Sequence, residues 1–247
     1  MKKNKLLNEV KFHLKSLLLN TLLKPFSKCF TPGMNKIDFG DFERIKPFSV
    51  QFGFDRGGPV DRYYIENFLR LNSGYIKGYV LEVKDNEYTL RFGGSSVRES
   101  AVLDINPENR NATVIGDLAD LHEVAEDTFD CIILTQTLQY IYDYEKAVST
   151  CYRILKQGGV LLLTVPGISS TDFGELRSIW HMSFTRNSIS NMLLEFFQPE
   201  KIAIATFGNV MVAAGFLYGM GLPEFSRKQM DKNDPLYQLI ITAKATK

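Results

Sequence analysis

The sequence predicts an α/β domain built on a mostly parallel sheet of about seven strands that is covered by helices. Short apolar runs with β-branched residues recur between residues 79 and 245, and polar or helical stretches separate them. Strands spaced in this way favour crossover connections, which place helices over a parallel sheet. The chain has 247 residues, 45% of them hydrophobic, so it can bury the core that such a sheet needs.

The apolar runs give seven predicted strands. They are YVLEV (79–83), AVLDI (101–105), ATVIGD (112–117), FDCIILT (129–135), GVLLLTV (159–165), KIAIATFG (201–208) and YQLIITAKA (237–245). No internal repeat and no low-complexity tract interrupts them. One α/β domain therefore accounts for most of the chain.

Three stretches with helical spacing of apolar residues are predicted helices: residues 61–74, 144–159 and 188–197. In the first, Asp61 is expected to cap the N-terminus and Gly74 to end the helix. In the second, Gly158 is expected to stop the helix.

Residues 1–30 are strongly basic, with seven lysines against one glutamate, and their Leu and Phe residues recur at roughly helical spacing. Charged residues interrupt the apolar run and no small-residue cleavage site follows, which argues against a signal peptide. The apolar stretch is also too short to span a bilayer. A basic amphipathic helix can lie on an anionic membrane or on a partner protein, and packing on its own domain is the alternative.

Overall charge and cysteine usage narrow the function classes. A formal net charge of +1 disfavours a nucleic-acid substrate, because nucleic-acid binders usually carry a large basic excess. The cysteines and histidines are too widely separated to form a local metal-binding signature, so no metal site is expected. The cysteines are odd in number and far apart, which favours free thiols and therefore a protein of the reducing cytoplasm. The cysteines are Cys29, Cys131 and Cys151, and the histidines are His13, His122 and His181.

Polar residues stand at the ends of the first four predicted strands, where ligands bind in doubly wound sheets. Glu82 ends the first strand, and an acid such as Asp104 at the end of the second can accept two hydrogen bonds from a ribose. Asp117 follows the third strand and could accept from an adenine amino group. Gln136 and Thr137 follow the fourth. Each acid alone is equally compatible with a solvated strand end or a helix cap.

This order of elements resembles the class I S-adenosylmethionine-dependent methyltransferases from about Gly78 to the C-terminus. The most specific segment is FDCIILTQTLQYIYDYEKAVSTCYRILKQGGVLLLTVPG (129–167), which is similar to that family's fourth strand, following helix and fifth strand. The upstream segment FGFDRGGPVDRYYIENFL (52–69) resembles a bacterial branch associated with surface glycan and glycosyltransfer pathways.

The resemblance implies a three-layer Rossmann-like methyltransferase fold whose last strand is antiparallel. Residues 31–60 are rich in Gly, Pro and Phe, so the sequence is expected to divide into residues 1–60, a basic helix followed by an irregular lid segment, and residues 61–247, the methyltransferase-like domain. The resemblance implies methyl transfer from the sulfonium of S-adenosylmethionine to a nucleophile, with the protein mainly positioning the two.

The resemblance also implies a set of cofactor-binding residues. Glu82 would touch the methionine end, Asp104 the ribose and Asp117 the adenine. The full set is Glu82, Val83, Lys84, Asp104, Ile105, Asn106, Asp117, Leu118, Gln136 and Thr137.

The loop after the first strand departs from the family. The pattern acid-x-Gly-x-Gly-x-Gly is replaced by Glu82-Val-Lys-Asp-Asn-Glu-Tyr, without a glycine. Glycine lets the backbone approach a ligand closely, so the loop is either a modified cofactor pocket or a filling of that pocket. Gly93 and Gly94, ten residues late, are expected to serve the turn toward the second strand.

His181, in SIWHMSFTRNSIS after the fifth strand, is a candidate base or acceptor ligand, with a packed or surface histidine as the alternative. Asp55 and Arg56 are candidate lid residues, in a polar cluster with Asp61 and Arg62 that salt bridges and a helix cap would equally explain. Tyr63, Tyr140 and Trp180 complete the predicted substrate and lid residues.

The sequence thus favours a cytoplasmic enzyme that methylates an oxygen of a sugar or small polar metabolite in glycan or natural-product biosynthesis. A small-molecule or glycan acceptor is expected, with peripheral membrane contact through residues 1–30. The alternative is a non-catalytic binding or assembly protein on the same fold. A nicotinamide-dependent oxidoreductase fits poorly, because the phosphate-binding glycines are missing.

Overall fold

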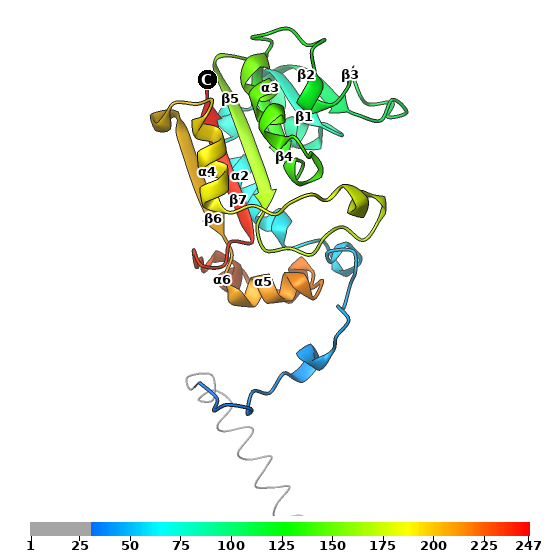
Figure 1. The fold of residues 1–247 in the computed structure, drawn as a ribbon, viewed down its shortest axis with the longest axis vertical. Coiled ribbons are helices and arrows are strands. Elements are labelled where there is room, and N and C mark those ends of the chain that lie inside the picture. Colours follow the sequence, from blue (N-terminus) through cyan, green and yellow to red (C-terminus); the bar gives the residue numbers. More distant parts are fainter. Residues whose placement is uncertain (1–30) are drawn as a thin grey trace, which may run out of the picture. The chain divides into compact units, whose positions relative to one another are not determined.

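The computed structural model describes residues 31–247 (Figure 1). The chain divides into two compact units, Met1–Ile45 and Lys46–Lys247. In the first, residues 31–45 are irregular apart from a 3₁₀ turn at Gly40–Glu43. The basic helix predicted for residues 1–30 lies outside the described residues.

The second unit contains a seven-stranded sheet in the order β3-β2-β1-β4-β5-β7-β6. All neighbouring pairs from β3 to β5 are parallel, and β7 runs antiparallel to both β5 and β6. The strands are β1 (Gly78–Val83), β2 (Val97–Asp104), β3 (Val114–Ile115), β4 (Phe129–Thr135), β5 (Leu155–Pro166), β6 (Ile202–Phe207) and β7 (Ile240–Thr246). The predicted mostly parallel sheet with an antiparallel last strand is confirmed.

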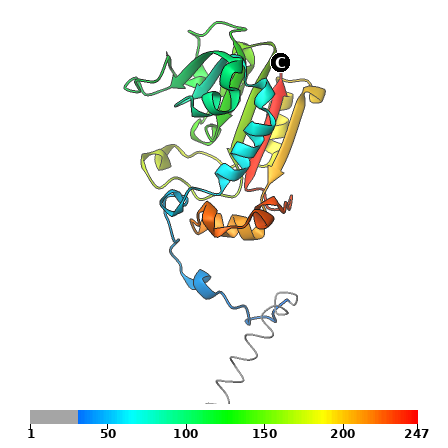
Figure 2. The same ribbon diagram turned by 180° about the vertical axis from the view of Figure 1, so that it is seen from behind.

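Helices cover both faces of this sheet. Helices α3 and α4 pack on one face, where they share a core with Leu81 and Ile132 (Figure 1). Helix α2 lies along the other face, as Figure 2 shows from behind, and shares a second core with α5, α6, Val80 and Ile133. The helices are α2 (Asp61–Leu71), α3 (Tyr144–Ile154), α4 (Arg186–Leu194), α5 (Val210–Leu217) and α6 (Arg227–Asp231).

The two cores explain why the strands appear in the sequence as continuous apolar runs. Successive residues of a strand point to opposite faces. In β4, Cys131 and Ile133 therefore enter the core of α2, while Ile132 and Leu134 enter the core of α3. A sheet buried on both faces needs apolar residues at every position of its central strands.

The structure corrects ends of all three predicted helices; α4 spans Arg186–Leu194 rather than 188–197, because Thr185 caps its N-terminus. Val60 takes the N-cap position of α2, so Asp61 is its first helical residue and does not cap it. The same helix ends at Leu71 rather than Gly74, because the Asn72 side chain bonds the Phe68 carbonyl and a 3₁₀ turn follows.

Helix α3 ends at Ile154, four residues before Gly158. The chain enters β5 at Leu155, which pairs with Phe129 of β4. Gly158 has φ +76° and lies inside β5, at an irregularity in its pairing with β4. Sheet pairing, and not the glycine, therefore ends this helix. Among the described residues, no helix is long and apolar enough to cross a membrane.

The late glycines lie where the sequence predicts them. The chain after β1 forms a π-helix, Thr89–Gly93, and then a 3₁₀ turn, Gly94–Ser96, that leads into β2. Gly94 has φ +52°, a backbone conformation that glycine adopts without strain. These glycines belong to the β1–β2 connection, as predicted.

Candidate functional site

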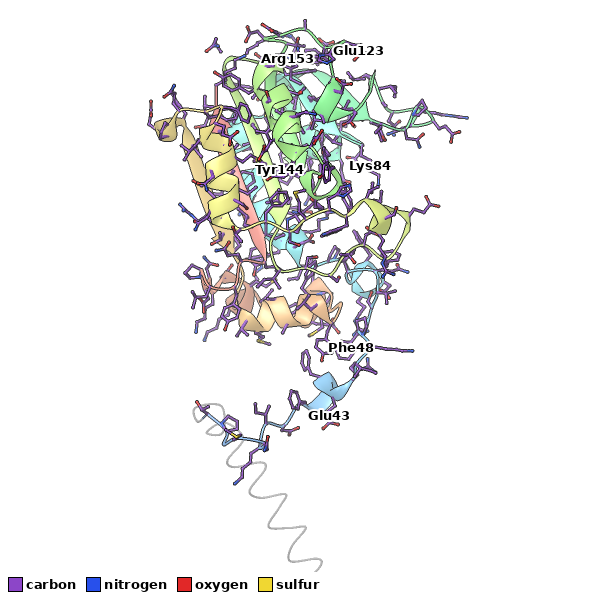
Figure 3. All side chains as sticks on the ribbon, in the orientation of Figure 1. Glu43, Phe48, Lys84, Glu123, Tyr144 and Arg153 are labelled. Carbon is purple, nitrogen blue, oxygen red and sulfur yellow. The ribbon has the colours of Figure 1, made fainter. Side chains whose placement is uncertain are left out.

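The candidate site is the edge of the sheet at which β1, β2 and β4 end. Strand order places β1 between β2 and β4, and the order in which strands are added to the sheet reverses between β1 and β4, although the two are parallel. Ligands of doubly wound sheets bind at such a switch point. Lys84, labelled in Figure 3, follows β1 directly at this edge.

Glu82 is buried at the end of β1, and its carboxylate holds the loop that follows. It accepts hydrogen bonds from the backbone N–H groups of Tyr88 (3.2 Å) and Thr89 (2.7 Å), and from the Thr89 hydroxyl (2.7 Å). Burial raises the pKa of Glu82 to about 7, and the Thr89 and Tyr88 hydrogen bonds oppose that rise. The buried Glu82 carboxylate thus fixes the loop after β1, and both of its oxygens already have hydrogen-bond partners.

Lys84 stands at the first glycine position of the family pattern and keeps the backbone conformation of a glycine. Its φ is +77°, in the left-handed region. A residue with a Cβ atom pays about 1–2 kcal/mol for that conformation. The side chain is exposed, while the backbone N–H donates to the Leu103 carbonyl of β2 at 2.8 Å. The tight turn is therefore present although its glycine is not.

Tyr88 stands at the third glycine position and fills it with a half-buried ring. The ring packs against Phe92 with centroids 5.9 Å apart. Burial raises the pKa of Tyr88 to about 12, while the positive charge of Arg62 lowers it and the charges of Glu66 and Asp61 raise it. The loop after β1 therefore faces the N-terminal half of α2 through an aromatic side chain.

Asp104 ends β2 as predicted, but both of its carboxylate oxygens already accept hydrogen bonds. Oδ1 accepts from the backbone N–H of Asn106 at 2.9 Å, and Oδ2 accepts from the Asn109 side-chain amide at 2.7 Å. The same amide also donates to the Lys84 carbonyl at 2.8 Å. Asn109 thus bridges the ends of β1 and β2. Ile105 beside Asp104 is 69% exposed.

The residues after β3 and β4 form two further turns at this edge. Asp117 is exposed and caps a 3₁₀ turn through the Ala119 N–H at 2.9 Å, while Leu118 is buried in the core under α3. Gln136 has φ +48° and its side chain donates to the Thr164 hydroxyl at 3.3 Å. The Thr137 hydroxyl bonds the carbonyl of Thr135.

The connection between β5 and α4 brings His181 close to the turn after β4. The His181 N–H donates to the Gln139 carbonyl at 2.8 Å, and its exposed ring meets Tyr142 edge-on at 5.5 Å. Beside it, Trp180 meets Tyr140 edge-on at 5.4 Å. The Tyr140 hydroxyl reaches Asp172 at 3.3 Å, and burial raises the Tyr140 pKa to about 12.

The predicted lid residues engage neighbours within the second unit. Asp55 accepts from the Ser49 hydroxyl, and Arg56 forms a salt bridge with Glu224. The Tyr63 hydroxyl donates to Asp231 of α6 at 2.5 Å. Asp55 and Arg56 thus have partners within the second unit, and their role as lid residues stays a prediction.

Sequence reasoning missed four residues at this edge: Thr89, Asn109, Gln139 and Asp172. Thr89 carried a usable signal, since it follows the altered loop and its hydroxyl can bond a buried acid. Each of the other three also bonds a residue far away in sequence, which no local pattern reveals: Asn109 bonds Lys84, Gln139 bonds His181 and Asp172 bonds Tyr140.

The described residues fit the main parts of S-adenosylmethionine, the cofactor that the resemblance implies. The Asp104 carboxylate offers acceptors to ribose hydroxyls, and Ile105 offers exposed apolar surface beside them. Two buried acceptors at this edge, Asp61 Oδ1 and Gln139 Oε1, have no partner among the described residues. A ribose at Asp104 would compete with the Asn109 amide for the same oxygen.

Comparison with known proteins agrees with this geometry. A family described as "Methyltransferase domain" matches residues 77–163, from the start of β1 into β5. A ubiquinone/menaquinone biosynthesis C-methyltransferase, UbiE, from Klebsiella pneumoniae is 31% identical over 86 residues, 35% of this chain and 32% of that one. The same enzyme from Haemophilus ducreyi is 34% identical over 71 residues, 26% and 27% of the two chains. The chain thus spans less than a third of these relatives' length.

Solved structures show the same fold. An S-adenosylmethionine-dependent methyltransferase from Archaeoglobus fulgidus aligns with a TM-score of 0.51 at 14% identity, over 75% of this chain and 94% of that one. Phosphoethanolamine N-methyltransferase 2 from Haemonchus contortus, solved with S-adenosyl-L-methionine, also gives 0.51 at 14% identity, over 86% and 60%.

These matches do not bear on the predicted association with glycan pathways, which stays a prediction. The matched segment, residues 77–163, covers β1 to β5 and all three acidic strand ends. Residues 77–163 match the methyltransferase domain family, and the chain has the fold of class I S-adenosylmethionine-dependent methyltransferases.

Proposed function

We propose that this chain binds S-adenosylmethionine and transfers its methyl group to a small acceptor. One observation carries the proposal: the segment that matches the methyltransferase domain contains the sheet edge at which β1, β2 and β4 end. Glu82, Asp104 and Gln136 lie at these three strand ends. Bound at that edge, S-adenosylmethionine supplies a methyl group activated by a positively charged sulfur. The protein's part is to hold this group in line with the acceptor.

Three residues divide the positioning work in this proposal. Asp104 binds the ribose hydroxyls once the Asn109 amide has been displaced from its Oδ2 atom. Glu82 binds no ligand directly but fixes the loop after β1 through Thr89. Ile105, which is exposed, offers apolar surface for the adenine.

For the acceptor, we propose a hydroxyl group of a sugar or small polar metabolite. Support comes from the connection between β5 and α4, where the exposed His181 ring lies near the Tyr140–Trp180 pair and Asp172. Aromatic faces stack on sugar rings, and an imidazole can accept the hydroxyl proton. The UbiE relatives are named as C-methyltransferases, so product analysis must ask whether carbon or oxygen carries the new methyl group.

A non-catalytic binding or assembly role is the second candidate. The observation that favours it is the occupation of cofactor positions by the protein itself. The Asn109 amide takes the ribose-binding oxygen of Asp104, and the Tyr88 ring stands at the third glycine position. In this alternative, the altered loop has replaced the cofactor.

Calorimetry on an Asp104→Ala variant distinguishes the two candidates. Wild-type protein should bind S-adenosylhomocysteine, the demethylated product, and Asp104→Ala should weaken that binding by about 1–3 kcal/mol, as expected for a lost charged hydrogen bond. Asn109→Ala is the matched control, because it removes the competing amide, together with its bond to the Lys84 carbonyl, and keeps the Asp104 carboxylate; it should bind at least as well as wild type. Unchanged affinity in Asp104→Ala would mean that the ribose site is placed wrongly.

We further propose a cytoplasmic location with peripheral membrane contact through residues 1–30. The support is the excess of seven lysines over one glutamate in that segment together with its apolar residues.

A further inference from the structure

Two buried oxygen atoms at the sheet edge have no hydrogen-bond partner among residues 31–247. They are Oδ1 of Asp61, whose residue is 9% exposed, and Oε1 of Gln139, whose residue is 1% exposed. Buried polar side-chain atoms are nearly always hydrogen-bonded in folded proteins. Two unsatisfied acceptors therefore point to a donor that joins the structure when a ligand binds.

Both atoms belong to the same edge of the sheet. Helix α2 precedes β1, with a 3₁₀ turn between them, and packs on the sheet. The charge of its first residue, Asp61, acts on Tyr88, which bonds Glu82 at the end of β1. Gln139 follows β4, the strand beside β1. The charge of Arg62 acts on both Tyr88, in the loop after β1, and Tyr140, next to Gln139. Asp61 and Gln139 thus lie at the same edge of the sheet, each next to residues on which the charge of Arg62 acts.

The chemistry of the two atoms specifies the ligand group. The carboxylate oxygen and the amide oxygen are both acceptors, and one N–H of the Gln139 amide donates to the Gln136 carbonyl at 2.9 Å. The missing group must therefore be a donor, and a positive charge would also offset the buried carboxylate. Among the described residues no cluster of three or more His, Cys, Asp or Glu could hold a metal ion, which favours an organic cation.

Arg62, the neighbour of Asp61, adds the opposite charge to the site. In the described part of the chain its guanidinium forms no salt bridge, although it acts electrostatically on Asp61 and Tyr88. An acid and a guanidinium side by side complement the ammonium and carboxylate of an amino acid. Within the proposed cofactor, only the methionine end carries that pair of charges.

We propose that Asp61 and Gln139 bind the ammonium group at the methionine end of the cofactor. This inference rests on the proposed function and changes its residue assignment. Glu82, which the family resemblance places at the methionine end, is fully engaged by Tyr88 and Thr89. Asp61 takes that role from the far side of the altered loop.

The test compares two ligands on the full chain by calorimetry: S-adenosylhomocysteine, and its deaminated analogue with hydrogen in place of the ammonium group. Wild type should bind S-adenosylhomocysteine at least about tenfold more tightly than the analogue. Asp61→Asn should abolish this preference while leaving affinity for the analogue within about twofold. Glu66→Gln is the matched control, because Glu66 is a carboxylate of the same helix that forms a salt bridge with Arg91. This variant should keep the preference for S-adenosylhomocysteine over the analogue.

Gln139→Met provides a second, uncharged test should Asn at position 61 disturb the helix. It removes the amide oxygen and should reduce the preference for the ammonium-bearing ligand by severalfold. Retention of the full preference in both variants, or equal binding of the two ligands by wild type, would overturn the inference and leave the proposed function standing. If wild type binds neither ligand at millimolar concentration, the proposed function itself fails.

Discussion

Replacing Lys84 by glycine should stabilise the protein. Lys84 has φ +77°, a left-handed conformation that costs about 1–2 kcal/mol for a residue with a Cβ atom. Glycine removes that cost but loses about 0.5–1 kcal/mol more backbone entropy on folding. The two hydrogen bonds at this position, to Leu103 and from Asn109, are made by the backbone and survive the change.

The difference of these terms leaves about 0.5–1 kcal/mol in favour of Lys84→Gly, or about 1–4 °C in Tm for a chain of this size. Chemical unfolding in urea and thermal unfolding by circular dichroism measure both quantities. Lys84→Ala is the matched control: it also removes the exposed side chain but keeps the Cβ atom, so it should not be stabilised. If the glycine variant is no more stable than the alanine variant, the turn is not strained and the argument for a retained glycine geometry fails.

Three further predictions address the buried Glu82 carboxylate, the candidate base His181 and residues 1–30. The folded-state pKa of Glu82, about 7, lies above the ordinary 4.5. Between pH 4.5 and pH 7 the folded protein therefore keeps a proton on Glu82 that the unfolded chain has lost. The free energy of unfolding should therefore fall by about 3 kcal/mol as pH rises from about 4.5 to about 7. Glu82→Gln should remove most of that slope in urea unfolding, and an unchanged slope would mean that another group titrates. His181→Ala should leave S-adenosylhomocysteine affinity unchanged but slow methyl transfer by about 10²–10⁴-fold, and full turnover would exclude His181 as the base. Removal of residues 1–30 should reduce sedimentation with anionic vesicles, whereas equal partitioning of both forms would count against a membrane contact.

The fold was predictable because each central strand is buried on both faces. Cys131 to Leu134 alternate between two cores, so every position is apolar and the strand stands out in the sequence. Helix ends were less predictable, since tertiary pairing sets them. Phe129 pairs with Leu155 and ends α3 before its glycine.

The start of α2 shows the same limit. An aspartate before an apolar helical pattern is a normal cap, yet the helix begins one residue earlier. Pro59 pairs with Gly221, some 160 residues further along the chain, and the N–H of Arg62 bonds the Pro59 carbonyl. Asp61 consequently becomes a buried helical residue, and no local pattern contains that information.

The sequence predicted which residues stand at the strand ends of the candidate site, but not where their side chains point or what they bond. Strand ends located Glu82, Asp104 and Gln136 correctly, since parallel strands end at a common edge. The direction of each carboxylate depends on partners from other elements. Thr89 turns Glu82 toward the loop, and Asn109 occupies Asp104.

The central claim is that the altered loop after β1 still belongs to a cofactor site. Titration of wild-type protein with S-adenosylhomocysteine in a calorimeter tests it most directly. We predict saturable binding with one site per chain, although Lys84 and Tyr88 stand at two of the glycine positions. Absence of heat at millimolar ligand, with S-adenosylmethionine giving the same result, would contradict the claim and leave a protein in which Tyr88 and Asn109 occupy the place of the cofactor.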